Sequence, residues 1–353
     1  MNKILEFTNK YERFITPIFI VGGFILDNLT LRRSDLLAEN LLLALYLVIV
    51  GVVIVLINKY QNAKFHSILD FLLFFAFGGL FSVFTIFYGR SSFILVSWPF
   101  LTLLFGAMLS TEFLRKQYQR LNVQIGIYFL AIFSFLIFHL PTVTGIMSLG
   151  IFLISGVAAL AIIYLYIFIL KSFLNKNLFS HKISAVILGI YIVVNGMYVL
   201  NVIPPVPLIL KDVEIAHDVV RVENQYKITD EVNDRTRFLG FISFDEKITI
   251  VLGQKVYFFS AVFAPIKIKT EIIHHWQNYN EESDEWVTVA KVPIVLQGGR
   301  DDGYRSYSYI SSATNGKWRV SVETKNGQII GAQDFQVKTA KSLTGLKTEI
   351  KTK

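Results

Sequence analysis

Apolar residues fill the first two hundred positions in long runs. Seven runs follow one another, at residues 14–26, 41–57, 68–88, 93–109, 121–138, 146–170 and 183–203. A helix needs roughly 20 mainly apolar residues to cross a bilayer, and the second to seventh runs reach or approach that length. The first run has only 13 residues, so it crosses only by extending through Asp27 to Leu31, and it is otherwise re-entrant or interfacial. The pattern predicts a multi-pass α-helical membrane bundle of about seven transmembrane helices.

A proline-rich joint ends this region. Pro204, Pro205 and Pro207 lie within four positions, and proline interrupts a helix and restricts the residue before it to extended geometry. We therefore expect the last helix to stop near Ile203. The expected organisation is a transmembrane helical domain at 1–203, a proline-containing joint and entry segment at 204–225, a soluble β domain at 226–338 and a flexible basic tail at 339–353.

From about Tyr226 the apolar residues alternate with polar ones. Trp318, Val320 and Val322 are separated by Arg319 and Ser321, which is the two-residue period of a half-buried strand. Asn326-Gly327 is a strong hairpin signal, because both central residues of such a turn adopt positive φ. About seven short strands with regular turns predict an all-β, immunoglobulin-like antiparallel sandwich.

Composition and charge narrow the class of protein. The chain is 53% hydrophobic with a net charge of +8, and residues 1–203 hold 14 Lys/Arg against 7 Asp/Glu. Because these cations lie in short loops between apolar runs, they indicate a lipid bilayer as partner and argue against nucleic acid. The absence of cysteine excludes disulfides, thiolate metal sites and cysteine nucleophiles. We expect no cofactor and no metal.

The loop charges also predict the orientation. The N-terminal segment and the loops on the same side of the membrane carry 11 Lys/Arg, whereas the loops on the opposite side carry 3. Positive loops remain cytoplasmic. We therefore expect a cytoplasmic (inner) membrane protein with a cytoplasmic N-terminus, whose seven spans place the C-terminal domain in the periplasm or outside the cell.

Few ionisable groups lie inside the apolar runs. Asp27, Asp70 and His139 are the intramembrane polar candidates, since charges are costly in a bilayer and often functional there. Each also lies near a predicted helix end, where it can reach headgroups or water, and His139 is expected at a loop beside Pro141. No acid occurs between Glu112 and Asp212, which argues against ion coupling through carboxylates in the last three helices.

The β domain offers one loop and one histidine as candidates for ligand or partner binding. Arg300 and Arg305 can clamp a carboxylate or phosphate, and Tyr304 can stack on a sugar or peptide. Asp301 and Asp302 either pair with these arginines to stiffen a hairpin or, with Glu281, Glu282 and Asp284, approach a calcium site of unusual spacing. His274 and His275 point to opposite faces of one strand, so His275 is expected outside and His274 in the core.

Several short segments, from the proline joint to the end of the β domain, together form a recognisable set. They are Ile203–Leu208, Val256–Phe259, Val262–Pro265, His275-Trp276, Gly298–Arg305 and Gly316–Val320. This set resembles that of the bacterial membrane proteins that end in the domain of unknown function 2914. The resemblance implies an integral membrane protein with an exported domain, and it assigns no catalytic residue.

Three functions remain open from the sequence. The first is a membrane-anchored binding or interaction module, whose exported domain binds an envelope glycan, peptide or protein. The second is a transporter or channel-like protein for an uncharged or lipidic substrate, with the β domain as a lid. The third is an enzyme acting on lipid-linked material through Asp27, Glu39, Asp70 and His139. No hydrolase, phosphate-loop or dinucleotide motif is apparent.

Overall fold

A computed structural model describes residues 22–31, 33–60, 66–113, 115–174, 181–223, 225–231, 236–238, 242–244, 246–311, 313–343 and 347–353. The chain divides into two compact units. The helical unit comprises Met1–Arg90, Ser97–Thr144 and Ser148–Pro207, and the β unit comprises Ser91–Val96, Gly145–Met147 and Leu208–Lys353.

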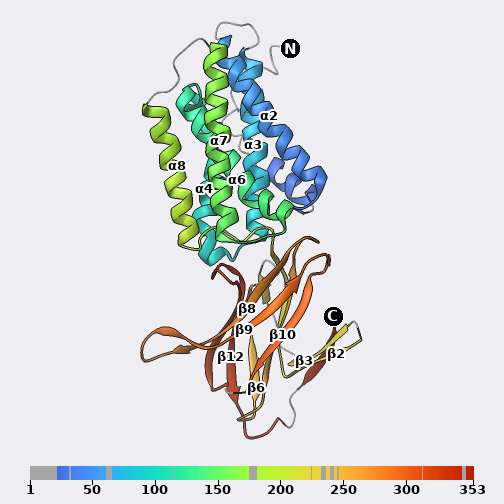
Figure 1. Ribbon diagram of the computed structural model, residues 1–353. Coiled ribbons are helices and arrows are strands. Elements are labelled where there is room, and N and C mark those ends of the chain that lie inside the picture. The colour runs from blue at the N-terminus through green and yellow to red at the C-terminus, as the bar shows by residue number, and fades with distance from the viewer. Residues whose placement is uncertain are drawn as a thin grey trace, which may run out of the picture. The chain divides into compact units, whose positions relative to one another are not determined.

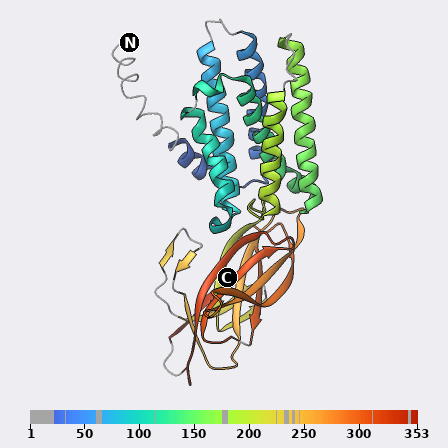
Figure 2. The same cartoon turned by 90° about the vertical axis from the view of Figure 1, so that its left-hand side faces the viewer.

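The helical unit is a bundle of long apolar helices (Figures 1 and 2). In the described part of the chain, six are long and apolar enough to cross a membrane, and they match the second to seventh predicted runs. They are α2 (Leu37–Lys59), α3 (His66–Arg90), α4 (Ile94–Phe113), α6 (Leu121–Thr144), α7 (Leu149–Leu174) and α8 (His181–Val199), with a short α5 (Arg115–Tyr118). Of the first predicted run, residues 22–26 begin a helix that extends to residue 30, and residues 14–21 lie outside the described residues.

Hydrogen bonds at both ends join α2 and α6 in antiparallel register. Asn58 near the end of α2 donates to Gln124 near the start of α6 (2.7 Å). His139 Nδ1 near the end of α6 lies 2.7 Å from Asn40 Oδ1 in the first turn of α2. Between these contacts Tyr166 of α7 donates to the backbone oxygen of Gly51 (2.8 Å). Polar groups inside an apolar bundle are satisfied by neighbouring helices.

His139 does not lie at a loop, as its neighbour Pro141 suggested. Helix α6 continues through Pro141 to Thr144. Pro141 lacks the backbone N–H that would bond the carbonyl of Ile137. Beside this position Thr142 and Thr144 donate their hydroxyls to the carbonyls of Phe138 (2.8 Å) and Leu140 (2.7 Å) and add hydrogen bonds to the last turns of the helix. Side-chain hydrogen bonds of this kind help to make proline tolerable in a membrane helix.

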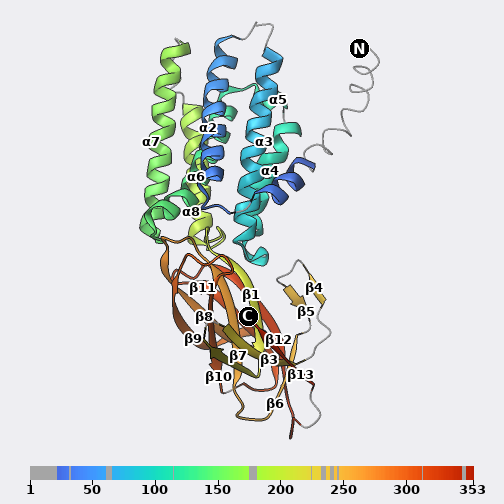
Figure 3. The same ribbon diagram turned by 90° about the vertical axis from the view of Figure 1, so that its right-hand side faces the viewer.

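The described residues of the β unit form four sheets. A three-stranded sheet has the order β1-β7-β10, a five-stranded sheet has the order β6-β12-β11-β8-β9, a small sheet has the order β13-β3-β2, and β4 with β5 forms a separate two-stranded ribbon (Figure 3). Pairing is antiparallel except between β6 and β12. The strands are β1 (Ile209–Ala216), β2 (Asp218–Val222), β3 (Gln225–Glu231), β4 (Thr236–Phe238), β5 (Ile242–Phe244), β6 (Lys247–Ile250), β7 (Val256–Phe263), β8 (Lys269–Asn280), β9 (Glu285–Gln297), β10 (Tyr304–Ile310), β11 (Gly316–Thr324), β12 (Ile329–Thr339) and β13 (Thr348–Thr352).

The three-stranded and five-stranded sheets share one hydrophobic core. Phe258 from β7 packs edge-to-face on Trp276 from β8, with ring centroids 6.2 Å apart. Trp276, Trp318 and Val320 are fully or almost fully buried in the same cluster, as the alternation in the sequence predicts. The turn at Asn326-Gly327 joins β11 to β12, and Gly327 has φ of +84°, which is the geometry that glycine accepts without strain.

Strands also form where the sequence indicated a joint and a mobile tail. β1 and β2 lie in the expected entry segment, and β13 lies in the expected tail. β13 pairs antiparallel with β3, so that Lys351 is opposite Ile228. A short polar strand without clear alternation has no local signal strong enough to predict it, and it forms here because β3 offers an open edge.

Candidate functional site

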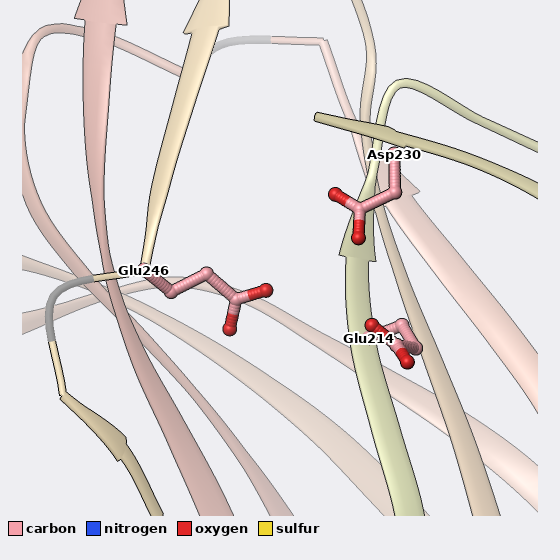
Figure 4. A group of neighbouring side chains, drawn as sticks. All are labelled: Glu214, Asp230 and Glu246. Carbon is pink, nitrogen blue, oxygen red and sulfur yellow. The ribbon is translucent and has the colours of Figure 1, made fainter. Parts of the chain in front are cut away.

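Three acidic side chains from distant segments meet inside the β unit. Glu214 comes from β1, Asp230 from β3 and Glu246 immediately precedes β6, and each offers a carboxylate oxygen within 4.8 Å of the others. Figure 4 shows the three carboxylates pointing toward one another. All three side chains are buried. Like charges this close repel strongly in a buried setting, so the group requires a cation or protons.

The C-terminal strand supplies cations to this acidic group. Lys351 Nζ lies 3.3 Å from Glu214 and 3.1 Å from Asp230. Lys353 Nζ lies 3.3 Å from the other oxygen of Glu214 and also contacts Asp212. Carboxylates of this kind can hold Mg²⁺ or Ca²⁺, and here two ammonium groups already provide positive charge beside Glu214 and Asp230. The acidic group therefore anchors β13 electrostatically.

Replacement of Lys351 with methionine should destabilise the β unit. The substitution leaves the buried Glu214 and Asp230 with less positive charge around them, and breaking such a pair typically costs about 3 kcal/mol when both partners are buried. Because Lys351 is a quarter exposed, we expect about 1–2 kcal/mol after solvent screening. Urea unfolding of the full chain in detergent measures the effect. Lys347→Met, at an exposed position before β13, is the matched control, and equal midpoints for the two variants would contradict the anchoring role.

The loop from Gly298 to Gly303 is held against a neighbouring loop by its backbone. Gly298 N–H donates to Ile268 O (2.9 Å) and Gly299 N–H to Ala264 O (3.0 Å). A Cβ at position 298 would collide with the carbonyl group of Pro265, and Gly299 and Gly303 have φ of +99° and +91°. The glycines therefore fix the conformation of the loop, and its charged side chains are presented from a rigid base.

The candidate side chains of this loop lie on its solvent side. Arg300, Asp301 and Asp302 are exposed, whereas Tyr304 is partly buried against the core. The guanidinium of Arg300 lies 5.6 Å from the centre of the Tyr304 ring. Arg305 Nη2 lies 3.9 Å from Asp302 Oδ2, whose side chain is 89% exposed, and an ion pair this long and this exposed contributes little stability. Arg305 is therefore only weakly held by Asp302, and Arg300 is exposed to solvent, so both can meet an anionic ligand. Asp301 and Asp302 do not belong to a group of potential metal ligands within the described residues.

His275 belongs to a hydroxyl–imidazole–carboxylate chain that crosses three strands. Nδ1 of His275 lies 2.8 Å from Glu323 Oε1 in β11, and Nε2 lies 2.8 Å from Thr288 Oγ1 in β9. Ser321 donates to the same Glu323 oxygen (2.5 Å). His275 was expected to face solvent, yet it is only 8% exposed, because these neighbours surround it. When Nδ1–H donates to the carboxylate, Nε2 is left to accept a proton from Thr288, as in a nucleophile–base–acid arrangement.

His274 lies on the opposite face of β8, in the core, and is fully buried. Its Nε2 lies 2.8 Å from Ser260 Oγ and its Nδ1 2.9 Å from Ser308 Oγ, and Trp276 Nε1–H donates to the same Ser308 oxygen (2.9 Å). Burial lowers the pKa of His274 to about 3, because the charged imidazolium is disfavoured away from water. The neutral imidazole thus joins the two sheets through hydroxyl groups.

The polar candidates of the helical unit do not converge on one point. Asp27 accepts a hydrogen bond from Ser82 of α3 (2.5 Å), and His139 contacts Asn40 of α2. Asp70 lies in the first turns of α3, 3.8 Å from His66. Asp70 and Ser82 are twelve residues apart on this helix, which is about 18 Å at 1.5 Å per residue. Asp70 is therefore remote from the Asp27 contact.

Sequence reasoning missed Glu214, Asp230, Glu246, Glu323 and Thr288. One local signal was present for Asp230, which follows Tyr226 and Ile228 on the buried face of β3. An acid in an inward-facing register position requires a partner. The other contacts join residues that are far apart in the sequence, and local patterns do not report such contacts.

Comparisons with known proteins give one family match in the β unit. Residues 269–337 match the family described as "Protein of unknown function (DUF2914)". No curated protein matches the chain. Among solved structures, β-glucosidase from Listeria innocua in complex with isofagomine is 14% identical, with a TM-score of 0.22, over 33% of this chain and 16% of that one. Pseudomonas fluorescens alkylpurine DNA glycosylase AlkC, bound to DNA containing an abasic site analog, is 13% identical, with a TM-score of 0.22, over 80% of each chain. Scores this low carry no argument about this chain.

Proposed function

We propose that the chain is a membrane-anchored binding or interaction module. In this proposal seven helices cross the cytoplasmic membrane, and the β unit, an immunoglobulin-like sandwich, is displayed on the outer side. The β unit binds an envelope component, peptide or partner protein through surfaces that include the Gly298–Arg305 loop. The observation that carries the proposal is a rigid loop that presents the exposed Arg300 and the weakly paired Arg305, on a folded unit separate from six apolar helices.

The charge distribution supports this orientation. Loops on the N-terminal side of the apolar runs hold 11 Lys/Arg against 3 on the opposite side, and such an excess marks the cytoplasmic face. The count over the last six runs already places the β unit outside, whichever way the first run is arranged.

The absence of native cysteine makes the orientation simple to test. In intact cells with a permeabilised outer envelope, a membrane-impermeant maleimide should label a Glu282→Cys variant, which changes an exposed residue between β8 and β9. It should not label a Gln117→Cys variant in α5 until the membrane is lysed. The reverse pattern would place the β unit in the cytoplasm and remove the proposal.

Binding is tested by crosslinking in living cells. A photoreactive amino acid replacing Asp301 should give discrete adducts, and the same residue replacing Gln117 is the matched control. Adding Arg300→Gln and Arg305→Gln should reduce the adducts from position 301 severalfold, since the arginines are the proposed anion contacts. A crosslinking yield that does not change with the arginines would mean that this loop is not the binding site.

A second candidate function, acyl transfer, is favoured by the chain of Thr288, His275 and Glu323. Thr288 is exposed, and the register of β8 with β9 shifts beside it, between Trp276 and Gln277; irregular strand positions of this kind occur often near active sites. In this function Thr288 Oγ attacks an ester carbonyl while His275 Nε2 takes its proton. The ester C–O bond breaks and the alcohol leaves with that proton. Water, which gives a proton to the same nitrogen, then hydrolyses the acyl–Thr288 ester to a carboxylic acid and restores the hydroxyl. Steady release of p-nitrophenol from p-nitrophenyl acetate, abolished by Thr288→Val but retained in Thr314→Val, tests it.

A further inference from the structure

Four tyrosines form a continuous row, three of them on the outer face of the sheet β1-β7-β10 and the fourth on β3 of the small sheet. The tyrosine row consists of Tyr226, Tyr307, Tyr257 and Tyr309. Ring centroids are 6.1 Å apart for Tyr226 and Tyr307, 6.2 Å for Tyr307 and Tyr257, and 5.4 Å for Tyr257 and Tyr309. Each ring thus lies within contact distance of the next along the row.

Strand alternation turns Tyr307 and Tyr309 toward solvent, whereas Tyr226 is buried in a small hydrophobic cluster against which Tyr257 packs. In β10 the side chains of Ser306 and Ser308 are buried, whereas Tyr307 and Tyr309 are 39% and 48% exposed. Tyr309 is opposite Tyr257 of β7 in the antiparallel register. Tyr226 from β3 completes the row at its more buried end and donates its hydroxyl to Arg305 O (3.4 Å). Two paired strands and a covering strand therefore hold the rings in place.

Cations lie at both ends of the tyrosine row. Lys255 Nζ lies 4.2 Å from the centre of the Tyr309 ring, and the Arg221 guanidinium lies 6.0 Å from the centre of the Tyr226 ring. Arg305 occupies the next outward position of β10 after Tyr307, opposite Ala261. The surface thus combines ring faces, phenol hydroxyls and positive charge.

These features select among ligands. An aliphatic protein partner requires a surface rich in Leu, Ile or Val, and the outward positions of this row are tyrosine, lysine and arginine. Sugar rings place C–H groups on one face and hydroxyls at the edge, so tyrosine serves both through its ring and its phenol group. Because the flanking cations attract carboxylate or phosphate groups, we propose that the tyrosine row binds an anionic polysaccharide strand.

This inference rests on the proposed function, because an exported β unit meets envelope polysaccharides. Single-stranded nucleic acid also stacks on aromatic rings beside cations, but an outward-facing unit is not exposed to it. A proline-rich peptide can also lie along aromatic side chains. Binding of either ligand in place of a polysaccharide is distinguished by the experiment below.

The probe is polygalacturonate, an anionic linear polysaccharide, presented to the full chain in lipid nanodiscs. We expect saturable binding by biolayer interferometry that weakens with salt, because part of it is electrostatic. Tyr307→Ala with Tyr309→Ala should weaken binding roughly tenfold or more, since a few aromatic residues usually dominate an interface. Tyr309→Phe keeps the ring and should stay within about twofold. Lys255→Gln should flatten the salt dependence.

Matched controls separate this inference from a failure of folding or of the proposed function. Tyr279→Ala removes a tyrosine from the β8–β9 hairpin and should leave binding unchanged. Amylose, a neutral polysaccharide, should bind far more weakly than polygalacturonate. Binding that survives loss of both tyrosines, absence of polygalacturonate binding, or a tyrosine-dependent preference for oligo(dT) or polyproline would each overturn the inference. If crosslinking from position 301 persists in any of these cases, the proposed function stands and only the polysaccharide assignment fails.

Discussion

Acidification from pH 6.5 to pH 5 should steadily destabilise the β unit, and His274→Gln should remove most of that effect. The pKa of His274 is about 3 in the folded chain because the ring is buried, against an ordinary value of 6.5. Between these values the unfolded chain binds a proton that the folded chain does not. The free energy of unfolding therefore falls as pH falls, by up to about 1.4 kcal/mol per pH unit. Above pH 6.5 neither state is protonated, and the full stability is present.

The measurement is urea unfolding of the full chain in detergent at several pH values from 7.5 to 5. Glutamine keeps a donor and an acceptor for Ser260 and Ser308 but does not titrate. His181→Gln, at the exposed start of α8, is the control and should leave the slope unchanged. A slope that is the same in wild type and His274→Gln would mean that the imidazole is not held neutral by burial.

Glu231 affects stability in a lower pH window. Burial raises the pKa of its carboxyl, but contacts from His217 and Thr249 outweigh this and the net pKa lies below its usual 4.5. Thr249 N–H donates to this carboxylate at 3.0 Å. A carboxylate with a lowered pKa stabilises the fold above its unfolded value and loses that contribution as pH falls through the folded value. Between pH 6.5 and pH 5 the change in the free energy of unfolding therefore reports on His274 and not on Glu231.

Replacement of Trp276 with alanine should cost about 4 kcal/mol, the largest single effect expected in the β unit. The indole is fully buried, lies against Phe258 and Phe335, and donates to Ser308. The substitution opens a cavity between the two sheets and removes that hydrogen bond. Trp276→Phe keeps most of the ring volume, so we expect about half the loss.

Pulse proteolysis across a urea series measures this loss without relying on tryptophan emission. Trp286→Ala is the matched control, because the Trp286 side chain is only partly buried. The guanidinium carbon of Arg319 lies 4.3 Å from the centre of its ring. The control substitution should cost about 1 kcal/mol, the range of an exposed cation–π contact with its packing. A Trp276→Ala midpoint close to that of Trp286→Ala would contradict the shared core.

Some site features follow from local pattern and others do not. The burial of His274 and Trp276 follows from alternation along β8, because successive side chains on a strand face opposite sides. The same rule predicted an exposed His275, and this was wrong because alternation assigns a face and says nothing of what surrounds it. Glu323 is 48 residues away from His275 in the chain, and strand order alone brings the two together.

In the helical unit, too, some features follow from local sequence pattern and others depend on tertiary contacts. The second to seventh apolar runs each predicted a helix, and most of the helix ends agree to within four residues, since hydrophobic length is a local property. The end of α6 was harder to predict, because a proline normally ends a helix, whereas here the helix continues through Pro141 and the hydroxyls of Thr142 and Thr144 add hydrogen bonds to its last turns. Contacts such as Asn40 with His139 depend on which helices are neighbours.

By itself the sequence determined the six long apolar helices, the change to a β domain after the proline joint, and the buried face of the strands with clear alternation, because each of these is written in the period and length of neighbouring residues. Only the tertiary structure decided that β13 pairs with β3, that Lys351 meets Glu214 and Asp230, and that Tyr257 lies opposite Tyr309. These contacts depend on strand order and register, and many alternative pairings have the same local pattern.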